Sequence, residues 1–174
     1  MKIINSLYIK KYRFFYELFF MLIFSLLMTS YIGFARVSGD SMEPSFRSNN
    51  ILLVNKKFSI NKIKRGDIII AKSPNGTNIV KRVIGLPKEN IQVDENGHVL
   101  INEKFLKEDY INKFKPPYGD RIPDFFDNNH IIISEKTPDN SVFIMGDNRG
   151  NSVDSRSHGP IELSDVIGKV IFKI

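Results

Sequence analysis

One uninterrupted apolar segment near the N-terminus constrains the fold of this chain more than any other feature. No charged residue occurs from Leu18 to Ala35, a run of 18 residues. A helix rises about 1.5 Å per residue, so this run would span roughly 27 Å, close to the thickness of a lipid hydrocarbon core. We therefore interpret residues 14–35 as a transmembrane helix, which makes the lipid bilayer one expected partner of the chain.

The charges beside this segment predict its orientation. Residues 1–13 contain four bases and no acid, and positively charged flanks remain on the cytoplasmic side of a membrane. We expect a single-pass protein of the cell membrane, with residues 1–13 in the cytoplasm and residues 36–174 forming one extracytoplasmic domain. A cleavable signal peptide is the alternative, because Gly33-Phe34-Ala35 has the small-x-small form of a cleavage site. The apolar run is longer than that of most signal peptides.

The net charge of +6 does not indicate nucleic-acid binding. Without the four N-terminal bases and Glu17, the 25 bases and 19 acids of the chain fall to 21 and 18, and these are spread along the sequence. A basic stripe interleaved with aromatic residues is missing, so we expect no nucleic-acid partner. The chain has no cysteine and three histidines, so we also expect no metal site, no cofactor and no thiol chemistry.

The region after the apolar segment predicts a mainly β fold. Short apolar runs separated by turn residues are typical of strands. A Ser-Pro-Asn-Gly turn at 73–76 predicts a hairpin, and an Asn-Gly pair at 96–97 predicts another, with His98 solvated at its tip. Residues 112–129 show no clear periodicity and are interpreted as a long loop. The expected strands lie at 51–54, 68–71, 78–85, 91–93, 99–101, 131–133, 142–145 and 166–172.

A candidate nucleophile and base can be chosen from the residues themselves. Ser41 lies in the glycine-containing turn Ser38–Pro44, and a serine hydroxyl needs a base to become a nucleophile. Lys81 lies in a strand-like run whose alternation places it on the face of Ile79 and Val83. A lysine on an apolar face is unusual, so we predict that Lys81 is that base. An isolated Ser-Gly-Asp-Ser run is otherwise typical of an ordinary polar turn.

Four segments, in this order and spacing, resemble the type I signal peptidases, in particular the form with a single membrane anchor. They are S-G-D-S-M-E-P at 38–44, R-G-D-I-I-I-A at 65–71, V-K-R-V-I-G at 80–85 and G-D-N-R-G-N-S-V-D-S-R at 146–156. The resemblance implies an N-terminal transmembrane helix followed by a mixed β-ribbon catalytic domain. It also implies a serine endopeptidase that removes signal peptides from secreted preproteins through an acyl-enzyme, without a cofactor.

The resemblance assigns roles to individual residues. Ser41 matches the nucleophile and Lys81 matches the general base. Ser152 matches the hydroxyl that orients the lysine amine. Gly39 stands where some relatives with two anchors carry a serine that helps to bind the oxyanion, so the second oxyanion donor beside the Ser41 N–H stays open. Positions that match bracing residues of the site are Asp147, Asp154 and Arg156.

Two expectations follow from these roles. The resemblance implies small substrate residues at the first and third positions before the cut, and we expect Met42, Ile79 and Val80 to form shallow apolar pockets for them. A carboxylate beside the Lys81 amine would raise its pKa. We therefore expect Arg156 to engage Asp154 and direct it away from Lys81.

Three other hypotheses remain open. A Ser-His-Asp hydrolase would use His98, His130 or His158 as its base. A self-cleaving Ser/Lys repressor would carry a DNA-binding region where this chain has an apolar segment. A membrane-tethered binding protein would keep the same fold without catalysis.

Overall fold

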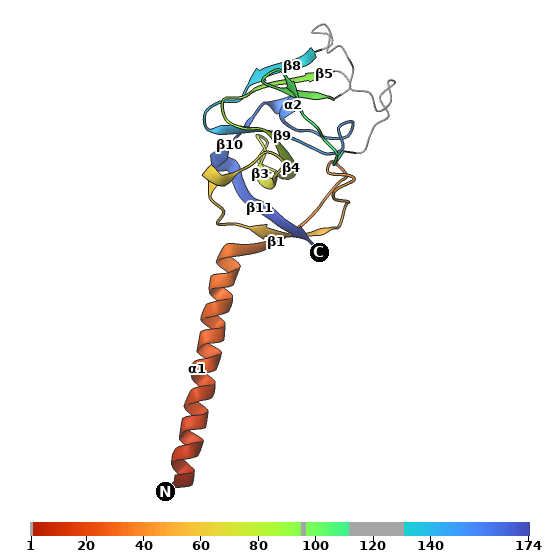
Figure 1. The fold of residues 1–174 in the computed structure, drawn as a ribbon. Helices are drawn as coiled ribbons and strands as arrows, with labels where there is room; N and C mark the ends of the chain where they lie inside the picture. Colours follow the sequence, from red (N-terminus) through yellow and green to blue (C-terminus); the bar gives the residue numbers. More distant parts are fainter. Residues whose placement is uncertain (1, 95–96, 112–130) are drawn as a thin grey trace.

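The structure is a computed structural model that describes residues 2–94, 97–111 and 131–174. Figure 1 shows a long helix that projects from a β domain, with the C-terminus near the junction of the two. Helix α1 spans Lys2–Tyr31, and from Tyr12 to Tyr31 every side chain is exposed. That 20-residue stretch is long and apolar enough to cross a membrane.

Helix α1 ends four residues earlier than the predicted residue 35. Residues 32–36 instead form strand β1 (Ile32–Arg36), which pairs antiparallel with β2 (Ile51–Asn55). The Lys56 N–H donates to the Tyr31 carbonyl at 2.8 Å, and the Lys56 ammonium lies 3.3 Å from the Thr29 carbonyl. These donors satisfy carbonyls that the end of a helix leaves free. The apolar run therefore passes from helix to strand without a linker.

The larger sheet has seven strands in the order β1-β2-β11-β3-β4-β9-β10. Each neighbouring pair is antiparallel. The predicted hairpin around residues 73–76 is confirmed, since β3 pairs with β4 from Ile68↔Arg82 to Lys72↔Asn78. The remaining strands of this sheet are β3 (Ile68–Lys72), β4 (Asn78–Gly85), β9 (Ser141–Met145), β10 (Ile161–Glu162) and β11 (Val166–Lys173).

The smaller sheet has four strands in the order β7-β6-β5-β8. Its second predicted hairpin is confirmed by the pairing of β5 with β6. His98 differs from the expectation of a solvated tip, because its Nδ1 lies 2.8 Å from a carboxylate oxygen of Asp94. The predicted 112–129 loop lies outside the described residues. The strands of this sheet are β5 (Asn90–Asp94), β6 (Val99–Ile101), β7 (Lys104–Phe105) and β8 (Ile131–Lys136).

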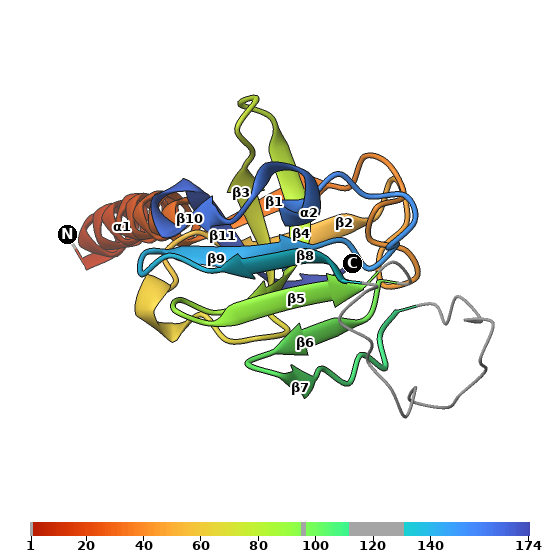
Figure 2. The same ribbon diagram turned by 90° about the horizontal axis from the view of Figure 1, so that it is seen from above.

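Strand β4 lies at the centre of the domain, with its two faces in different apolar clusters. Ile79 and Val83 pack in one cluster together with Ile69 and Ile144. On the opposite face, Val80 packs in a cluster that contains Met42, and Ile84 packs in a cluster that contains residues of the smaller sheet. In Figures 1 and 2, β5 lies beside β8. Side chains of β4 are therefore held by packing on both faces.

The predicted fold class is confirmed as a mainly β domain that follows an N-terminal apolar helix. Short helical segments complete the domain: α2 (Ser155–His158) and the 3-10 turns η1 (Ile60–Lys62) and η3 (Leu163–Asp165).

Candidate active site

Ser41 lies in a turn whose neighbours are anchored in the core. Gly39 has φ of +83°, a left-handed conformation that favours glycine. Met42 is 1% exposed and packs with Val37 and Phe46. Ser41 itself is half-buried, and in the described part of the chain its N–H donates to no acceptor. Met42 therefore anchors the turn, and its role in a substrate pocket stays a prediction, while Ser41 remains partly accessible.

Lys81 is buried in the middle of β4. It is 3% exposed and pairs in register with Ile69 of β3. Among the residues that the structure describes, its amine makes no hydrogen bond and no ion pair. Burial lowers the pKa of Lys81 below its ordinary value, although the charge of Asp154 acts in the opposite direction. A lower pKa increases the neutral fraction of the amine, as a general base requires.

Asp154 is the centre of a buried polar cluster behind Lys81. It is 0% exposed, and Arg156 donates to both of its oxygens, each at 2.9 Å. The Gly146 N–H donates to Asp154 Oδ2 at 2.8 Å, and the Ser152 hydroxyl donates to the same oxygen at 2.6 Å. Burial raises the pKa of Asp154, but the bonds and charge of Arg156, together with the bonds from Gly146 and Ser152, lower the pKa overall. Asp154 is therefore a charged carboxylate.

This cluster differs from the expected arrangement in two respects. Arg156 engages Asp154 as predicted, yet the Asp154 charge still raises the pKa of Lys81 more than any other group does. Ser152 donates to Asp154, and no hydrogen bond joins it to Lys81 among the described residues. A carboxylate is a stronger acceptor than a neutral amine, which explains this choice. The lone pairs of the Ser152 hydroxyl stay free to accept from an amine N–H.

Residues 146–149 connect this cluster to the Ser41 turn, although the two segments are far apart in sequence. The Asn148 N–H donates to the Ser41 carbonyl at 3.0 Å, and its side-chain amide donates to the Asp40 carbonyl at 3.2 Å. A Cβ atom on Gly146 would overlap with the Ser41 carbonyl oxygen and the Ser152 hydroxyl. Gly146 and Asn148 were not predicted as site residues, because nothing in their local pattern marks this contact.

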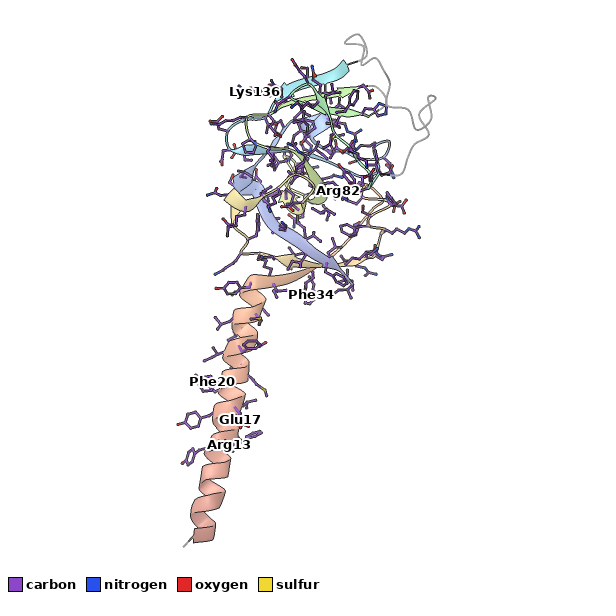
Figure 3. The ribbon with its side chains drawn as sticks, viewed as in Figure 1. Arg13, Glu17, Phe20, Phe34, Arg82 and Lys136 are labelled. Atoms are coloured by element: carbon purple, nitrogen blue, oxygen red, sulfur yellow. The ribbon has the colours of Figure 1, made fainter. Side chains whose placement is uncertain are left out.

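Asp147 holds residues 146–149 against β4. Arg82 donates to its two carboxylate oxygens at 2.8 and 2.6 Å, and both side chains are at most 10% exposed. Figure 3 shows Arg82 within the domain. Because Arg82 follows Lys81 on β4, one strand carries both the candidate base and the arginine that secures Asp147. Sequence reasoning did not assign this role to Arg82.

The two histidines that the structure describes give no support to a Ser-His-Asp site. His158 Nδ1 lies 2.9 Å from the Gly159 carbonyl, and His98 contacts Asp94. In the described ranges no hydrogen bond joins either of them to Ser41. His130 lies outside the described residues.

Comparisons with known proteins show which proteins this chain is similar to. A family model described as "Signal peptidase, peptidase S26" matches residues 11–174. A protein of Bacillus caldolyticus named "Signal peptidase I" is 36% identical over 139 residues, which cover 79% of this chain and 76% of that protein. "Signal peptidase I V" of Bacillus subtilis is 35% identical over 137 residues, covering 78% of this chain and 81% of that protein. A crystal structure of a signal peptidase I from Enterococcus faecalis is 30% identical, with a TM-score of 0.49, and covers 65% of this chain and 100% of that one.

Proposed function

Because this chain belongs to the signal peptidase family, peptidase S26, we propose that it is a membrane-anchored serine endopeptidase with a Ser41/Lys81 dyad. It removes signal peptides from preproteins through an acyl-enzyme. The observation that carries the proposal is the buried Lys81 amine, which has no ion-pair partner among the described residues and has a lowered pKa.

The dyad chemistry follows from the state of Lys81. An unperturbed lysine has a pKa of about 10.4, so roughly 0.4% of it is neutral at pH 8. The lowered pKa of Lys81 makes a larger fraction available. Lys81 Nζ takes the proton of Ser41 as Oγ attacks the scissile carbonyl, and it gives that proton to the leaving amine when the peptide bond breaks. Water then hydrolyses the Ser41 ester and restores the free hydroxyl.

The backbone of the Ser41 turn supports the stabilisation of the oxyanion. The Ser41 N–H has no acceptor in the described part of the chain, so it is available to a tetrahedral intermediate. A donor of this kind contributes about 2.7–4 kcal/mol to catalysis. Gly39 offers no hydroxyl, and the second donor comes from another group.

Strand β4 offers an edge for the substrate. Residues 78–80 pair with β3 alone, whereas pairing with β9 involves Arg82, Val83 and Gly85. An extended preprotein segment binds there as an added strand. Ile79 and Val80 are half-buried and lie on opposite faces of β4. Each therefore offers a shallow apolar contact on its own face, and such a contact suits small residues at the first and third positions before the cut.

The apolar helix supports a location of this chemistry at a membrane surface. Residues 14–31 supply the anchor, residues 1–13 remain in the cytoplasm because of their four bases, and the extracytoplasmic peptidase domain begins with β1, four residues before the predicted residue 36. Cleavage after Ala35 would remove nearly all of β1, which pairs with β2 along its whole length. This pairing supports a retained anchor over a cleaved signal peptide.

One experiment tests the proposal against its rivals. Full-length protein in detergent is incubated with a signal-bearing preprotein, and new N-termini are identified by mass spectrometry. We expect cleavage after a small residue by the natural protein and none by Ser41→Ala. Binding without a new N-terminus would support the non-catalytic binding protein. A new N-terminus only within this chain would support the self-cleaving protease.

A further inference from the structure

A buried ion pair lies outside the dyad and touches the segment that holds Ser41. Arg149 donates to both carboxylate oxygens of Glu108, and its Nη1 lies 2.8 Å from Glu108 Oε2. The two side chains are 9% and 5% exposed. The same guanidinium donates through Nε to the Gly146 carbonyl at 3.1 Å and through Nη1 to the Gly97 carbonyl at 2.8 Å. Glu108 therefore fixes the arginine that holds Gly146.

Tyr110 extends this contact to Asp147. Its hydroxyl donates to Glu108 Oε1 at 2.5 Å, and its ring lies 3.9 Å from the Arg82 guanidinium carbon. Arg82 in turn donates to both oxygens of Asp147. A cation over an aromatic face is attracted by the ring quadrupole. Tyr110 thus joins the Glu108–Arg149 pair to the Arg82–Asp147 pair.

These two ion pairs fix the segment 146–149, because they include Asp147 and Arg149, which precede and follow Asn148. Arg149 holds the carbonyl of Gly146, and Arg82 holds the side chain of Asp147. The next residue, Asn148, donates its N–H to the Ser41 carbonyl at 3.0 Å. A shift of this segment therefore moves the backbone of Ser41.

We propose that Glu108 and Tyr110 are positioning residues for the Ser41 turn, acting through Arg149 and Arg82; this rests on the proposed function of Ser41. Both follow β7, near the end of the described range 97–111, and neither touches the dyad in any described contact. They act by keeping Ser41 at the distance from the scissile carbonyl that its attack requires. A misplacement of about 1 Å in such a site costs on the order of 100-fold in rate.

The charge balance of this network makes its members interdependent. Burial lowers the pKa of Arg149, but the hydrogen bond and charge of Glu108 reverse this effect and raise it overall. Removal of the Glu108 charge leaves a buried cation without compensation, which is more disruptive than removal of both charges together. A variant that lacks both charges should therefore be more stable than one that lacks only the Glu108 charge. Comparing the activity of these two variants separates a positioning role from a purely structural one.

The test compares four variants of the full-length protein. Glu108→Gln removes the charge, and Tyr110→Phe removes only the hydroxyl while keeping the ring over Arg82. The double variant Glu108→Met with Arg149→Met removes both charges. Asp109→Asn is the matched control, because Asp109 lies on the same segment in an ion pair with Lys107 whose side chains are 75% and 85% exposed.

The kinetic outcomes decide the proposal. We expect Glu108→Gln to lower kcat about 10- to 100-fold with little change in KM, and Tyr110→Phe to lower it less. The pH at half-maximal activity stays unchanged, since Lys81 is untouched. The double variant should unfold at a higher denaturant midpoint than Glu108→Gln, because no buried charge is left unpaired. Its kcat should stay low, because the bond from Arg149 to the Gly146 carbonyl is missing. Recovery of kcat together with stability would overturn the proposal, and Asp109→Asn should match the natural protein.

A second readout separates this proposal from the proposed function. Hydrogen exchange at the Asn148 amide reports its bond to the Ser41 carbonyl, whatever the protein cleaves. We expect faster exchange in Glu108→Gln and in the double variant, and unchanged exchange in Asp109→Asn. If the natural protein cleaves nothing, the proposed function fails, but faster exchange still supports the positioning role. Unchanged exchange in both variants overturns it.

Discussion

Lys81 imposes a direction on the pH dependence of activity. The base must be neutral, and burial lowers the pKa of Lys81. We expect kcat/KM to rise with pH along a limb whose apparent pKa lies well below 10.4. Lys81→Ala and Lys81→Arg should both be inactive, since a guanidinium does not deprotonate. A Lys81→Ala protein that cleaved with the same acid limb would identify another base, and His158 would then be the first residue to examine.

The same pKa change predicts an effect on stability. Because the folded pKa lies below the unfolded one, the unfolded state binds more protons between these two values, so stability rises with pH across that window. Lys81→Met removes the cost of burying an ammonium. We expect this variant to unfold at higher denaturant concentration at neutral pH, with the difference narrowing as the pH approaches 10.4. A less stable variant at neutral pH would contradict this reading of Lys81.

Gly146 allows the close approach of two segments at the site. A methyl group there would overlap with the Ser41 carbonyl oxygen and the Ser152 hydroxyl. Overpacking of this kind costs about 1–3 kcal/mol, so we expect Gly146→Ala to lower both the free energy of unfolding and kcat. Chemical denaturation and initial rates measure the two effects. Asn151→Ala is the control, because its exposed side chain can be removed while the backbone bond to Asn148 is kept.

At the scale of elements, the free part of β4 sets an expectation for substrate choice. In an extended segment, the first and third residues before the cut share one side and the second points the other way. We expect phenylalanine at the first position to lower kcat/KM by about 100-fold or more, as a shallow pocket requires. A matched peptide with phenylalanine at the second position should still be cut. Equal cleavage of both peptides would contradict binding of the substrate as an added strand.

The longer strands could be predicted from the sequence, and the shortest could not. Alternation and turn residues located β3, β4 and the β5–β6 hairpin, where several residues repeat one pattern. Strands β7 and β10 have two residues each, which is too short for a period. Strand β1 was not predicted, because its residues continue the apolar run of α1. Only its pairing with β2 shows that it is a strand.

The candidate site also contains residues that could be predicted from the sequence and residues that could not. Six site residues lie in segments that resemble a known family and were therefore expected: Ser41, Lys81, Asp147, Ser152, Asp154 and Arg156. Arg82 and Asp147 are 65 residues apart and meet only after β4 and β9 pair. Glu108 has no local pattern at all, since its partner Arg149 is 41 residues away. Contacts of this kind depend on tertiary packing, which periodicity and turn signals do not report.

At the scale of the whole molecule, an exposed apolar surface surrounds the point where α1 enters the domain. Phe34 of β1 and Phe172 of β11 are both in register with Leu53 of β2, so the three side chains share one face. Phe34 is 70% exposed and Phe172 65% exposed, and Ile174 continues the surface. Figures 1 and 3 show the C-terminus and Phe34 at the end of the domain nearest α1. A large exposed apolar patch in this place fits contact with the membrane surface beside α1.

This placement predicts that Phe172 lies in the lipid interface while the smaller sheet stays in water. The chain has no tryptophan, so Phe172→Trp creates a single fluorescent reporter, and Lys136→Trp on β8 is its matched control at the far end of the domain (Figure 3). In lipid vesicles we expect a blue-shifted emission and quenching by brominated lipids for Phe172→Trp, and neither for Lys136→Trp, because only the first ring leaves water. Protease added outside right-side-out vesicles should digest the domain but not residues 1–13. Equal quenching of the two reporters would contradict a position of Phe172 in the lipid interface. Protection of the domain from the protease would contradict its position outside the vesicle.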